Sequence, residues 1–413
     1  MNIGFGEALL IVGGLLATAA ALSGVMRGTV LSTAVLSVIL GIALALAGVV
    51  EIEVDDTGVL ELIELALILT LISDGLVVER ELLGKHWGPP ARALVFAMPI
   101  TLALLACGAK LLFSELSWAE AFLLGAVLSP TDPVVTSTVV TAQRVPARIR
   151  HTLNLESGLN DGLALPFVLF FLVLAGTGGD PGSEAAELTG EATFGAVVGI
   201  AIGLLAGFVH RIVPGGVTAV YEGIYAVGFG LLAYGIADVT FGNGLIAAFV
   251  AGITLGYSEH KITEGFAPFS ENVSAIFQVL TFFVFGAIIV ATGYNGPIWA
   301  LIAFIPFALL IARPAAVMTS LAGTAIPGPQ KAFIAWFGPK GVASMLFAIL
   351  VLDAGVTNDL LVFDIAAFVI LASILAHGLT DTVGASWIER RMKLRDAEDE
   401  PQDTPPSRFR HDL

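Results

Sequence analysis

Within an apolar segment at about residues 149–176, the sequence reads Leu155-Glu156-Ser157-Gly158-Leu159-Asn160-Asp161-Gly162. Two carboxylates, a hydroxyl and an amide therefore fall within two turns of a segment that otherwise suits hydrocarbon. In a helix, Ser157 stacks over Asp161 and Glu156 over Asn160, so the polar groups converge on adjoining faces. An ionisable side chain at bilayer depth costs about 2.5–3.5 kcal/mol on insertion scales, so this cluster predicts an ion or substrate path.

The composition is that of a polytopic membrane protein. Of the 413 residues, 56% are hydrophobic and 13% are charged, and the mean hydropathy is +0.91, whereas soluble domains carry about 25% charged residues. The single cysteine, Cys107, excludes a disulfide framework or a cysteine metal cluster, and we expect it to be a small core residue. No positive residue precedes the first apolar stretch, so a cleaved signal peptide is not expected.

Apolar stretches of membrane-spanning length predict thirteen transmembrane helices. Their approximate ranges are 5–25, 28–50, 57–78, 92–113, 117–141, 149–176, 191–213, 218–238, 241–258, 270–293, 297–322, 330–354 and 358–388. All basic residues except Lys110, Arg313 and Lys340 lie on alternate connections or in the C-terminal tail. By the positive-inside rule the C-terminus is therefore cytoplasmic, and an odd number of spans leaves the N-terminus outside.

The chain divides into a transmembrane domain, residues 1–388, and a tail, residues 389–413. The tail is rich in acidic residues, proline and arginine, so we expect it to be a disordered cytoplasmic segment. The net charge of −16 is concentrated in the outer loops and this tail. Such acidity is typical of a salt-loving organism, and it would equally serve to attract cations from outside.

Two predicted spans are interrupted by proline or glycine. The fifth reads Leu128-Ser129-Pro130-Thr131-Asp132-Pro133-Val134, and two prolines this close remove backbone hydrogen bonds from a helix. Unwound backbone at membrane depth is tolerated where it lines a polar cavity, and its freed carbonyls then suit a hard cation. A simple proline kink is the alternative, although the acid and two hydroxyls inside the break disfavour it.

The twelfth span contains a matching interruption, Trp336-Phe337-Gly338-Pro339-Lys340-Gly341, again with a charge at the break. The fifth and twelfth spans correspond if spans 1–6 and 8–13 are two repeats joined by span 7, and an odd offset makes such repeats inverted. A pair of Gly/Pro-broken spans in corresponding positions of two halves points to the binding site of a transporter.

Five charges lie well inside spans near these features: Asp132, Glu156, Asp161, Arg313 and Lys340. We expect Glu156 to pair with Arg313, Lys340 to lie near a broken-helix end, and Asp132 to face Asp161. The five charges sum to minus one. The two aspartates cannot both stay bare, so the site should hold one proton or one cation.

The chemistry of the site predicts a competition between proton and metal ion. Oxygen ligands from Asp132, Asp161, the Ser157 hydroxyl and the Thr131 backbone suit a hard ion such as sodium. Either occupant neutralises the site, so occupied states should cross the membrane in a one-for-one electroneutral exchange. Asn160 stands where a second acid could have stood, which supports that stoichiometry.

One further motif, His377-Gly378-Leu379-Thr380, completes a set with Thr131-Asp132-Pro133, Glu156-Ser157, Asn160-Asp161, Arg313 and Gly338-Pro339-Lys340-Gly341. The set resembles the motifs of monovalent cation/proton antiporters of the sodium/proton exchanger type, in their electroneutral prokaryotic branch, over almost the whole chain. The resemblance implies an all-α, thirteen-helix inverted repeat with broken helices 5 and 12 crossing at mid-membrane. It also implies a six-helix ion-carrying core and a separate dimer domain.

In that family, the resemblance implies, the residue matching Asp161 carries the proton or sodium, and those matching Thr131, Asp132 and Ser157 complete the site. The residues matching Glu156, Asn160 and Arg313 hold it in shape. The family usually has arginine where this chain has Lys340. Because lysine is a titratable point charge, a pH response or an altered ion preference could originate there.

These expectations define the partners. We expect sodium or lithium and protons as substrates, no cofactor, a homodimer in the plasma membrane of a prokaryote, and no nucleic acid. Potassium/proton exchange is the alternative within transport, since no residue fixes ion size. From other classes we consider an intramembrane aspartyl hydrolase, built on Asp132 and Asp161, and a channel, although a site neutralised by one ion favours alternating access over a continuous pore.

Other polar residues in the spans receive weaker predictions. Asp74, Glu222, Glu271 and Asp364 are placed nearer span ends, where snorkelling or a water-facing funnel explains them, with a part in shaping the ion path as the alternative for each. The six histidines, His86, His151, His210, His260, His377 and His411, fall at or near the predicted cytoplasmic side. We expect interfacial loop residues there, with a cytoplasmic pH sensor as the alternative.

Overall fold

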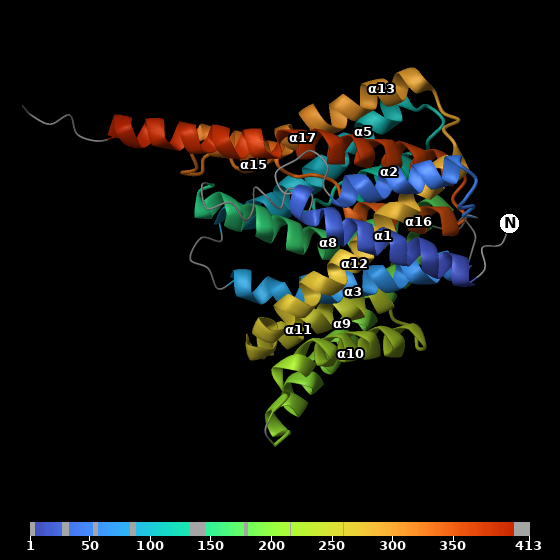
Figure 1. The fold of residues 1–413 in the computed structure, drawn as a ribbon, viewed down its shortest axis with the longest axis vertical. Helices are drawn as coiled ribbons and strands as arrows, with labels where there is room; N and C mark the ends of the chain where they lie inside the picture. The colour runs from blue at the N-terminus through green and yellow to red at the C-terminus, as the bar shows by residue number, and fades with distance from the viewer. Residues whose placement is uncertain are drawn as a thin grey trace, which may run out of the picture.

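Long helices laid side by side make up the molecule (Figure 1). The computed structural model describes residues 5–26, 33–52, 57–82, 88–132, 145–176, 181–214, 216–258 and 260–399. Every regular element within these ranges is helical. The predicted all-α class is therefore confirmed.

The elements follow the predicted apolar segments. In chain order they are α1 (Phe5–Met26), α2 (Thr33–Leu46), α3 (Thr57–Leu82), α4 (Gly88–Arg92), η1 (Ala93–Ala97), α5 (Met98–Leu112), α6 (Trp118–Val127), α8 (Ala147–Gly176) and α9 (Pro181–Ile212). They continue with α10 (Ala219–Asp238), α11 (Gly244–Ser258), α12 (His260–Thr292), α13 (Ile298–Pro306), η3 (Phe307–Ala312), α14 (Arg313–Ser320), α15 (Gly328–Trp336), α16 (Val342–Asp353) and α17 (Asp359–Asp399). In the described ranges, six helical segments are long and apolar enough to cross a membrane by themselves. The count of thirteen spans stays a prediction.

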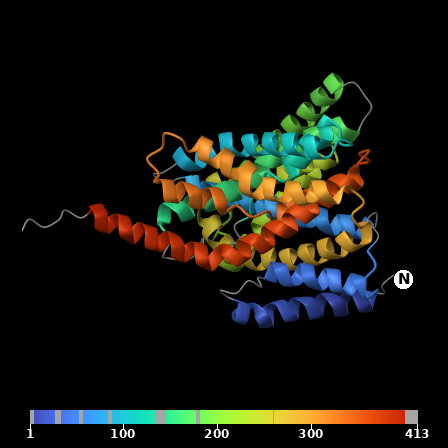
Figure 2. The ribbon, with the colours of Figure 1, turned by 90° about the horizontal axis from the view of Figure 1, so that it is seen from above.

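The helices form two groups that meet along α3 and α8. Helices α9, α10 and α11 lie together at one end of the view, and α5, α13 and α17 lie at the other (Figure 1). Helices α1 and α2 line one edge (Figure 2), where α2 packs on α12. Helix α3 packs on α11 and also on α8, so it joins the α9–α11 group to the helix that carries Asp161.

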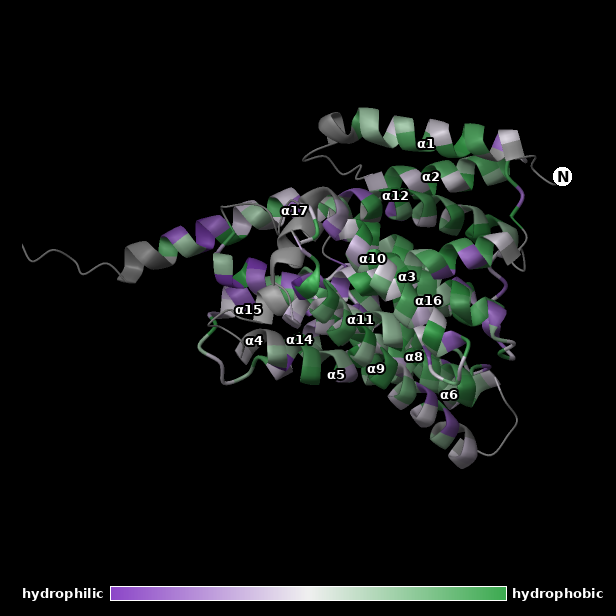
Figure 3. Ribbon diagram, turned by 90° about the horizontal axis from the view of Figure 1, so that it is seen from below, coloured by the Kyte–Doolittle hydropathy of each residue, from purple (hydrophilic) through white to green (hydrophobic). Residues whose placement is uncertain are grey.

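The bundle and the part of α17 that extends beyond it differ in hydropathy. Hydrophobic residues cover much of the bundle, and hydrophilic residues gather on the C-terminal part of α17, which extends beyond it (Figure 3). Cys107 on α5 is exposed together with Leu111, one turn further on. The expectation that Cys107 is a core residue is therefore wrong, because this face of α5 is left uncovered by other helices and suits lipid.

The C-terminal helix is longer than predicted. Helix α17 runs to Asp399, and Lys393 forms an ion pair of 2.7 Å with Glu389 one turn earlier. The expected disorder is therefore wrong for residues 389–399, while residues 400–413 lie outside the described part of the chain. Helix α1 begins at the end of the bundle opposite to the one where α17 ends (Figures 1 and 2).

Two π-helical turns occupy matching places. The elements η1 and η3 lie in the fourth and eleventh predicted segments, and each is followed by a helix with proline in its first turn, Pro99 in α5 and Pro314 in α14. Proline has no N–H to donate, so the regular ladder is interrupted there and a wider turn forms. The offset of seven segments is the same as between the two predicted breaks, which supports the expected pairing of repeats.

Candidate functional site

The first interruption begins where α6 ends. Ser117 and Glu120 form a capping box at the start of α6, and the helix ends at Val127, after which residues 129–132 are not helical. The ammonium group of Lys340 donates hydrogen bonds to the carbonyls of Ser129 (3.4 Å) and Pro130 (3.1 Å). A cation therefore lies at the carbonyl end of this half-helix, where the helix dipole is negative. The rest of the predicted fifth span, residues 133–141, lies outside the described residues.

The second interruption separates α15 from α16. Helix α15 ends at Trp336, α16 begins at Val342, and the residues between them are not helical. Asp132 connects the two breaks: its main-chain N–H donates to the carbonyl of Pro339 (2.9 Å), and its Oδ2 accepts the N–H of Val342 (3.1 Å). The carboxylate thus lies at the positive end of α16, in a reciprocal arrangement to Lys340 at the end of α6.

Two glycines of the second break allow this close contact. A Cβ added at Gly341 would overlap the side chain of Asp132, and one added at Gly338 would overlap the guanidinium of Arg313. The two glycines of the Gly338-Pro339-Lys340-Gly341 motif therefore leave space for two charged neighbours. The other two residues supply a carbonyl acceptor, from Pro339, and a cation, from Lys340.

Replacing Gly341 by alanine should displace Asp132. Overpacking of this kind costs about 1–3 kcal/mol, so in exchange assays with Gly341→Ala we expect the apparent KM for the cation to rise about tenfold or more. The matched control is Gly328→Ala, at the first residue of α15, where an added Cβ would meet nothing within 4 Å. An unchanged KM in Gly341→Ala would show that the position of Asp132 does not matter for binding.

Helix α8 presents its polar cluster to the first break. The Asn160 amide donates to the Thr131 hydroxyl (2.9 Å), which lies 3.4 Å from the Ser157 hydroxyl. Asp132 and Asp161 are each 8% exposed and interact electrostatically. Among the described residues, Asp161 Oδ1 and Asn160 Oδ1 have no hydrogen-bond donor, so both oxygens can accept from a ligand.

A buried ion pair lies beside this cluster. Arg313, the first residue of α14, donates through Nη1 to Glu156 Oε1 at 2.7 Å, and both side chains are nearly inaccessible. The expected pairing of Glu156 with Arg313 is confirmed. The two charges compensate one another, so Glu156 is not left as an additional bare carboxylate at the site.

A third acid at the site was misplaced by the sequence analysis. The carboxylate of Asp74 on α3 interacts electrostatically with those of Asp132 and Asp161. Its Oδ2 is buried, with no donor among the described residues. The placement of Asp74 near a span end was wrong because α3 continues to Leu82, past the predicted end. A charge about two turns inside an apolar helix was the signal that could have found it.

The remaining intramembrane residues have structural partners or lie elsewhere. Asp364 lies near the start of α17, as predicted, but it is buried and accepts a hydrogen bond from Thr292 (2.9 Å), so snorkelling does not explain it. His377 is buried in α17, which contradicts the expectation of an interfacial loop residue. The side chains of Glu271 and His260, and the whole of His86 and His411, lie outside the described part.

No group of three His, Cys, Asp or Glu side chains in the described ranges is placed to hold a resident metal ion. A cation at this site would therefore also need hydroxyl, amide or main-chain oxygens, which Ser157, Asn160 and Thr131 supply. A transported ion suits such a mixed set, because it must be released as well as bound.

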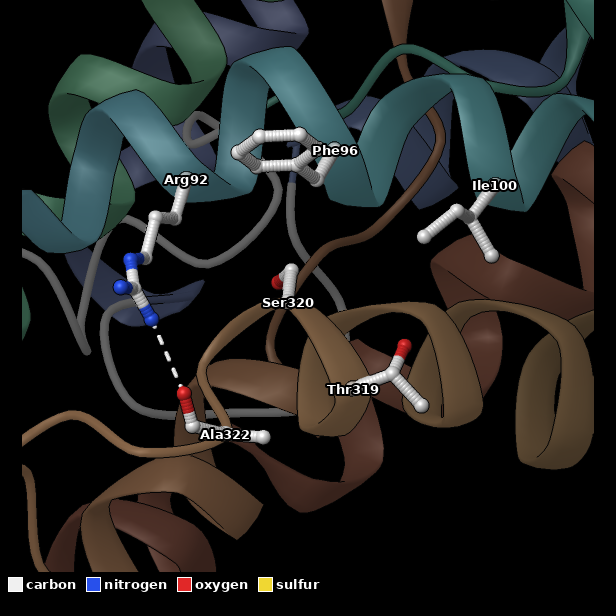
Figure 4. Close-up of a pocket in the computed structure, with 6 residues that line it drawn as sticks. All are labelled: Arg92, Phe96, Ile100, Thr319, Ser320 and Ala322. Carbon is white, nitrogen blue, oxygen red and sulfur yellow. Dashed lines mark hydrogen bonds between the residues drawn. The ribbon is translucent and has the colours of Figure 1, made fainter.

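A shallow pocket of about 260 Å³ lies elsewhere, between the start of the fourth segment and the end of α14 (Figure 4). Arg92 donates through Nη1 to the carbonyl of Ala322 (2.9 Å), and Phe96 and Ile100 line the same hollow. None of the predicted site residues lines this pocket, so we assign it no part in the chemistry of the site.

The chain is similar to known proteins over most of its length. The K(+)/H(+) antiporter NhaP of Alkalimonas amylolytica is 23% identical over 339 residues, covering 81% of this chain and 58% of the relative. The Na(+)/H(+) antiporter 2 of Zygosaccharomyces rouxii is 27% identical over 368 residues, covering 78% of this chain and 45% of the relative. The chain spans about half the length of the curated relatives it matches.

The fold has a solved counterpart. The sodium proton antiporter MjNhaP1 from Methanocaldococcus jannaschii at pH 8 matches with a TM-score of 0.74 and 22% sequence identity, over 93% of this chain and 97% of that one. At this identity the likeness concerns the fold. The transmembrane model of the sodium/hydrogen exchanger family matches residues 13–383. Because this match covers most of the chain, the protein belongs to the sodium/hydrogen exchanger family.

Proposed function

We propose that this protein exchanges a monovalent cation for protons by alternating access, with the two ions competing for Asp161 and Asp132. The observation that carries the proposal is the crossing of the two breaks, where Asp132 and Lys340 are each held by the opposite interrupted segment. Buried carboxylates among freed backbone groups favour binding of a hard cation, and removal of that cation requires a proton in its place.

The hydrolase considered from the two aspartates does not apply, because the family consists of exchangers rather than enzymes. Within the proposal, Ser157 and Thr131 supply oxygen ligands, while Glu156, Asn160, Arg313 and Lys340 structure the site. We also propose a homodimer in the plasma membrane of a prokaryote, with the N-terminus outside and the C-terminus in the cytoplasm.

Asp74 alters the charge count on which the stoichiometry depends. The five charges Asp132, Glu156, Asp161, Arg313 and Lys340 sum to minus one, and an ionised Asp74 makes the sum minus two. One-for-one exchange therefore requires that Asp74 keep the same protonation state throughout the cycle, either always protonated or always ionised. If Asp74 also released its proton, the exchange would carry net charge and would respond to membrane voltage.

Sodium is our first choice of cation and potassium the alternative. A relative from A. amylolytica carries a K(+)/H(+) name and one from Z. rouxii a Na(+)/H(+) name, and the oxygen ligands of the site suit either hard ion. Lys340 is the residue of the site at which a difference in ion preference could arise, since its ammonium is a point charge rather than a planar fork.

The deciding experiment uses purified protein in liposomes with an imposed pH gradient and a pH-sensitive dye. Sodium, lithium and potassium are added in turn, with and without a potassium/valinomycin voltage clamp. Dye recovery on sodium that ignores the clamp supports electroneutral sodium/proton exchange. Dye recovery on potassium alone would show that potassium is the transported cation. Recovery that changes with membrane voltage would refute the one-for-one stoichiometry. No recovery with any ion would refute antiport.

Asp74 provides a separate test of the charge count. If Asp74 remains protonated, Asp74→Asn keeps the same charge in every state, so the exchange should remain insensitive to the voltage clamp while the apparent KM changes by about tenfold or less. The measurement is the rate of dye recovery at several clamped voltages. A switch between voltage-dependent and voltage-independent exchange in Asp74→Asn would show that Asp74 releases a proton during the cycle.

A further inference from the structure

A chain of buried hydrogen bonds joins α17 to both sides of the second break. On one side, the carbonyl of Trp336, the last residue of α15, lies 2.8 Å from His377 Nε2. On the other side, the main-chain N–H of Lys340 donates to Ser373 Oγ at 2.9 Å. Ser373 Oγ lies 3.2 Å from His377 Nδ1, which closes the chain. Ser373, His377 and Lys340 are at most 2% exposed.

Each ring nitrogen of His377 faces a main-chain carbonyl, so either neutral form leaves one of these two contacts without a proton. With the proton on Nε2, the ring donates to Trp336, Nδ1 accepts the Ser373 hydroxyl proton, and Ser373 Oγ accepts from Lys340, while the Ser373 carbonyl, 2.6 Å from Nδ1, receives no proton from the ring. With the proton on Nδ1, the ring would donate within its own helix, to Ser373, and Nε2 would face the Trp336 carbonyl as acceptor to acceptor. Only the form with the proton on Nε2 therefore joins α17 to the end of α15 by a hydrogen bond from the ring. A doubly protonated ring would stand beside the cations of Arg313 and Lys340, with which His377 interacts electrostatically.

The side chain of Trp336 adds a second attachment to the same helix face. Its ring stacks on His377, with centroids 4.9 Å apart, and its indole N–H donates to Thr380 Oγ1 at 2.9 Å. Ser373, His377 and Thr380 follow one another at helical spacings of four and three, so they share one face of α17. We call these three residues the α17 clamp.

The clamp holds the backbone that holds the site. Between its two attachments, at Trp336 and Lys340, lies the carbonyl of Pro339, which accepts the Asp132 N–H. Two residues after Lys340 lies Val342, whose N–H donates to the Asp132 carboxylate. A shift of the 337–341 segment would therefore move Asp132 and withdraw the Lys340 ammonium from the end of α6.

We propose that His377 is a positioning residue for cation binding, which acts through Ser373 and the 337–341 segment to hold Asp132 and Lys340 in place. The proposal rests on the antiport function proposed above. In this role the neutral imidazole of His377 uses one nitrogen as a donor, to the Trp336 carbonyl, and the other as an acceptor, from the Ser373 hydroxyl. The proposal also explains why a polar face of α17 is directed into the bundle instead of toward lipid or water.

The test compares variants that keep or remove single links of the chain. The amide of His377→Gln can reach the Nε2 position and donate to Trp336, whereas the shorter amide of His377→Asn reaches only the Nδ1 position. Ser373→Thr keeps the hydroxyl, and Ser373→Ala removes it. Each variant is reconstituted in liposomes, and the apparent KM and maximal rate for the cation are measured at one pH. The control is Thr382→Ala, at an exposed position of the same helix.

We expect His377→Asn and Ser373→Ala to raise the apparent KM about five- to tenfold, as loss of one buried hydrogen bond would. The maximal rate per folded protein should change less, and His377→Gln, Ser373→Thr and the control should stay within about twofold of wild type. The combination of Ser373→Ala with His377→Asn should raise KM no further than either change alone, because both interrupt one chain.

Several outcomes would overturn the inference. Lower yields of folded protein with an unchanged KM would assign the clamp to stability alone, and equal KM values for His377→Gln and His377→Asn would remove the need for a donor at Nε2. Additive effects in the combined variant would show two independent contacts. If wild type exchanges no cation, the proposed function fails and this inference with it. If wild type exchanges while the His377 and Ser373 variants keep its KM, only the inference fails.

Discussion

Replacing Asp161 by asparagine should abolish exchange. The change removes the only charge that α8 contributes to the site besides the compensated Glu156, and the amide can neither release a proton nor neutralise a cation. We expect the rate of dye recovery in liposomes to fall at least about a hundredfold for every cation. The protein should still fold, since asparagine has nearly the same volume and can use the same hydrogen-bonding positions.

The control for this variant is Asp238→Asn, the same chemical change at an exposed position near the end of α10. We expect this control to exchange ions at the wild-type rate. Residual proton-coupled exchange in Asp161→Asn above about a tenth of the wild-type rate would place the essential carboxylate elsewhere, with Asp74 and Asp132 as the groups to examine next. Cation flux without proton coupling in the variant would favour a channel.

Breaking the buried pair of Arg313 and Glu156 should have the largest effect on stability. Arg313→Met leaves the Glu156 carboxylate buried without its cation, and loss of one partner of such a pair costs about 3–5 kcal/mol. We therefore expect a large fall in the melting temperature of the detergent-solubilised protein. The double variant Glu156→Leu/Arg313→Met should recover most of that loss, because two apolar side chains of similar volume need no charge compensation.

The exposed pair of Lys393 and Glu389 gives the matched control. Its N–O distance is the same, 2.7 Å, but the lysine side chain is 73% exposed and water screens the charges. Lys393→Met should therefore cost only about 0.3–0.5 kcal/mol. Equal losses from Arg313→Met and Lys393→Met would contradict the argument that burial makes the inner pair important. A double variant no more stable than the single would show that Arg313 is needed for packing, for example against Gly338.

The sequence by itself determined the class, and it predicted the apolar segments and most of the polar residues that the structure brings together. Hydrophobic length identifies spans because water is absent from the bilayer core, and a charge there is costly enough to stand out. Prolines and glycines identify the two breaks because they remove or relax backbone hydrogen bonds locally. The ion pair of Glu156 and Arg313 could be anticipated because a deep charge needs a partner, and few partners exist in the chain.

Only the tertiary structure decided which polar groups converge. Asp74 lies far from Asp132 and Asp161 in sequence, and its entry into the site depends on how α3 packs on α8 and how far α3 extends. The hydrogen bonds of Asp132 to Pro339 and Val342 also depend on the crossing of two segments about two hundred residues apart. From the sequence, His377 looked like one of several interfacial histidines. A sequence shows how far along a span a residue lies, but it does not show whether other helices cover the face on which its side chain lies. The relation between distant helices is set by packing and buried hydrogen bonds, and these depend on contacts that no local pattern records.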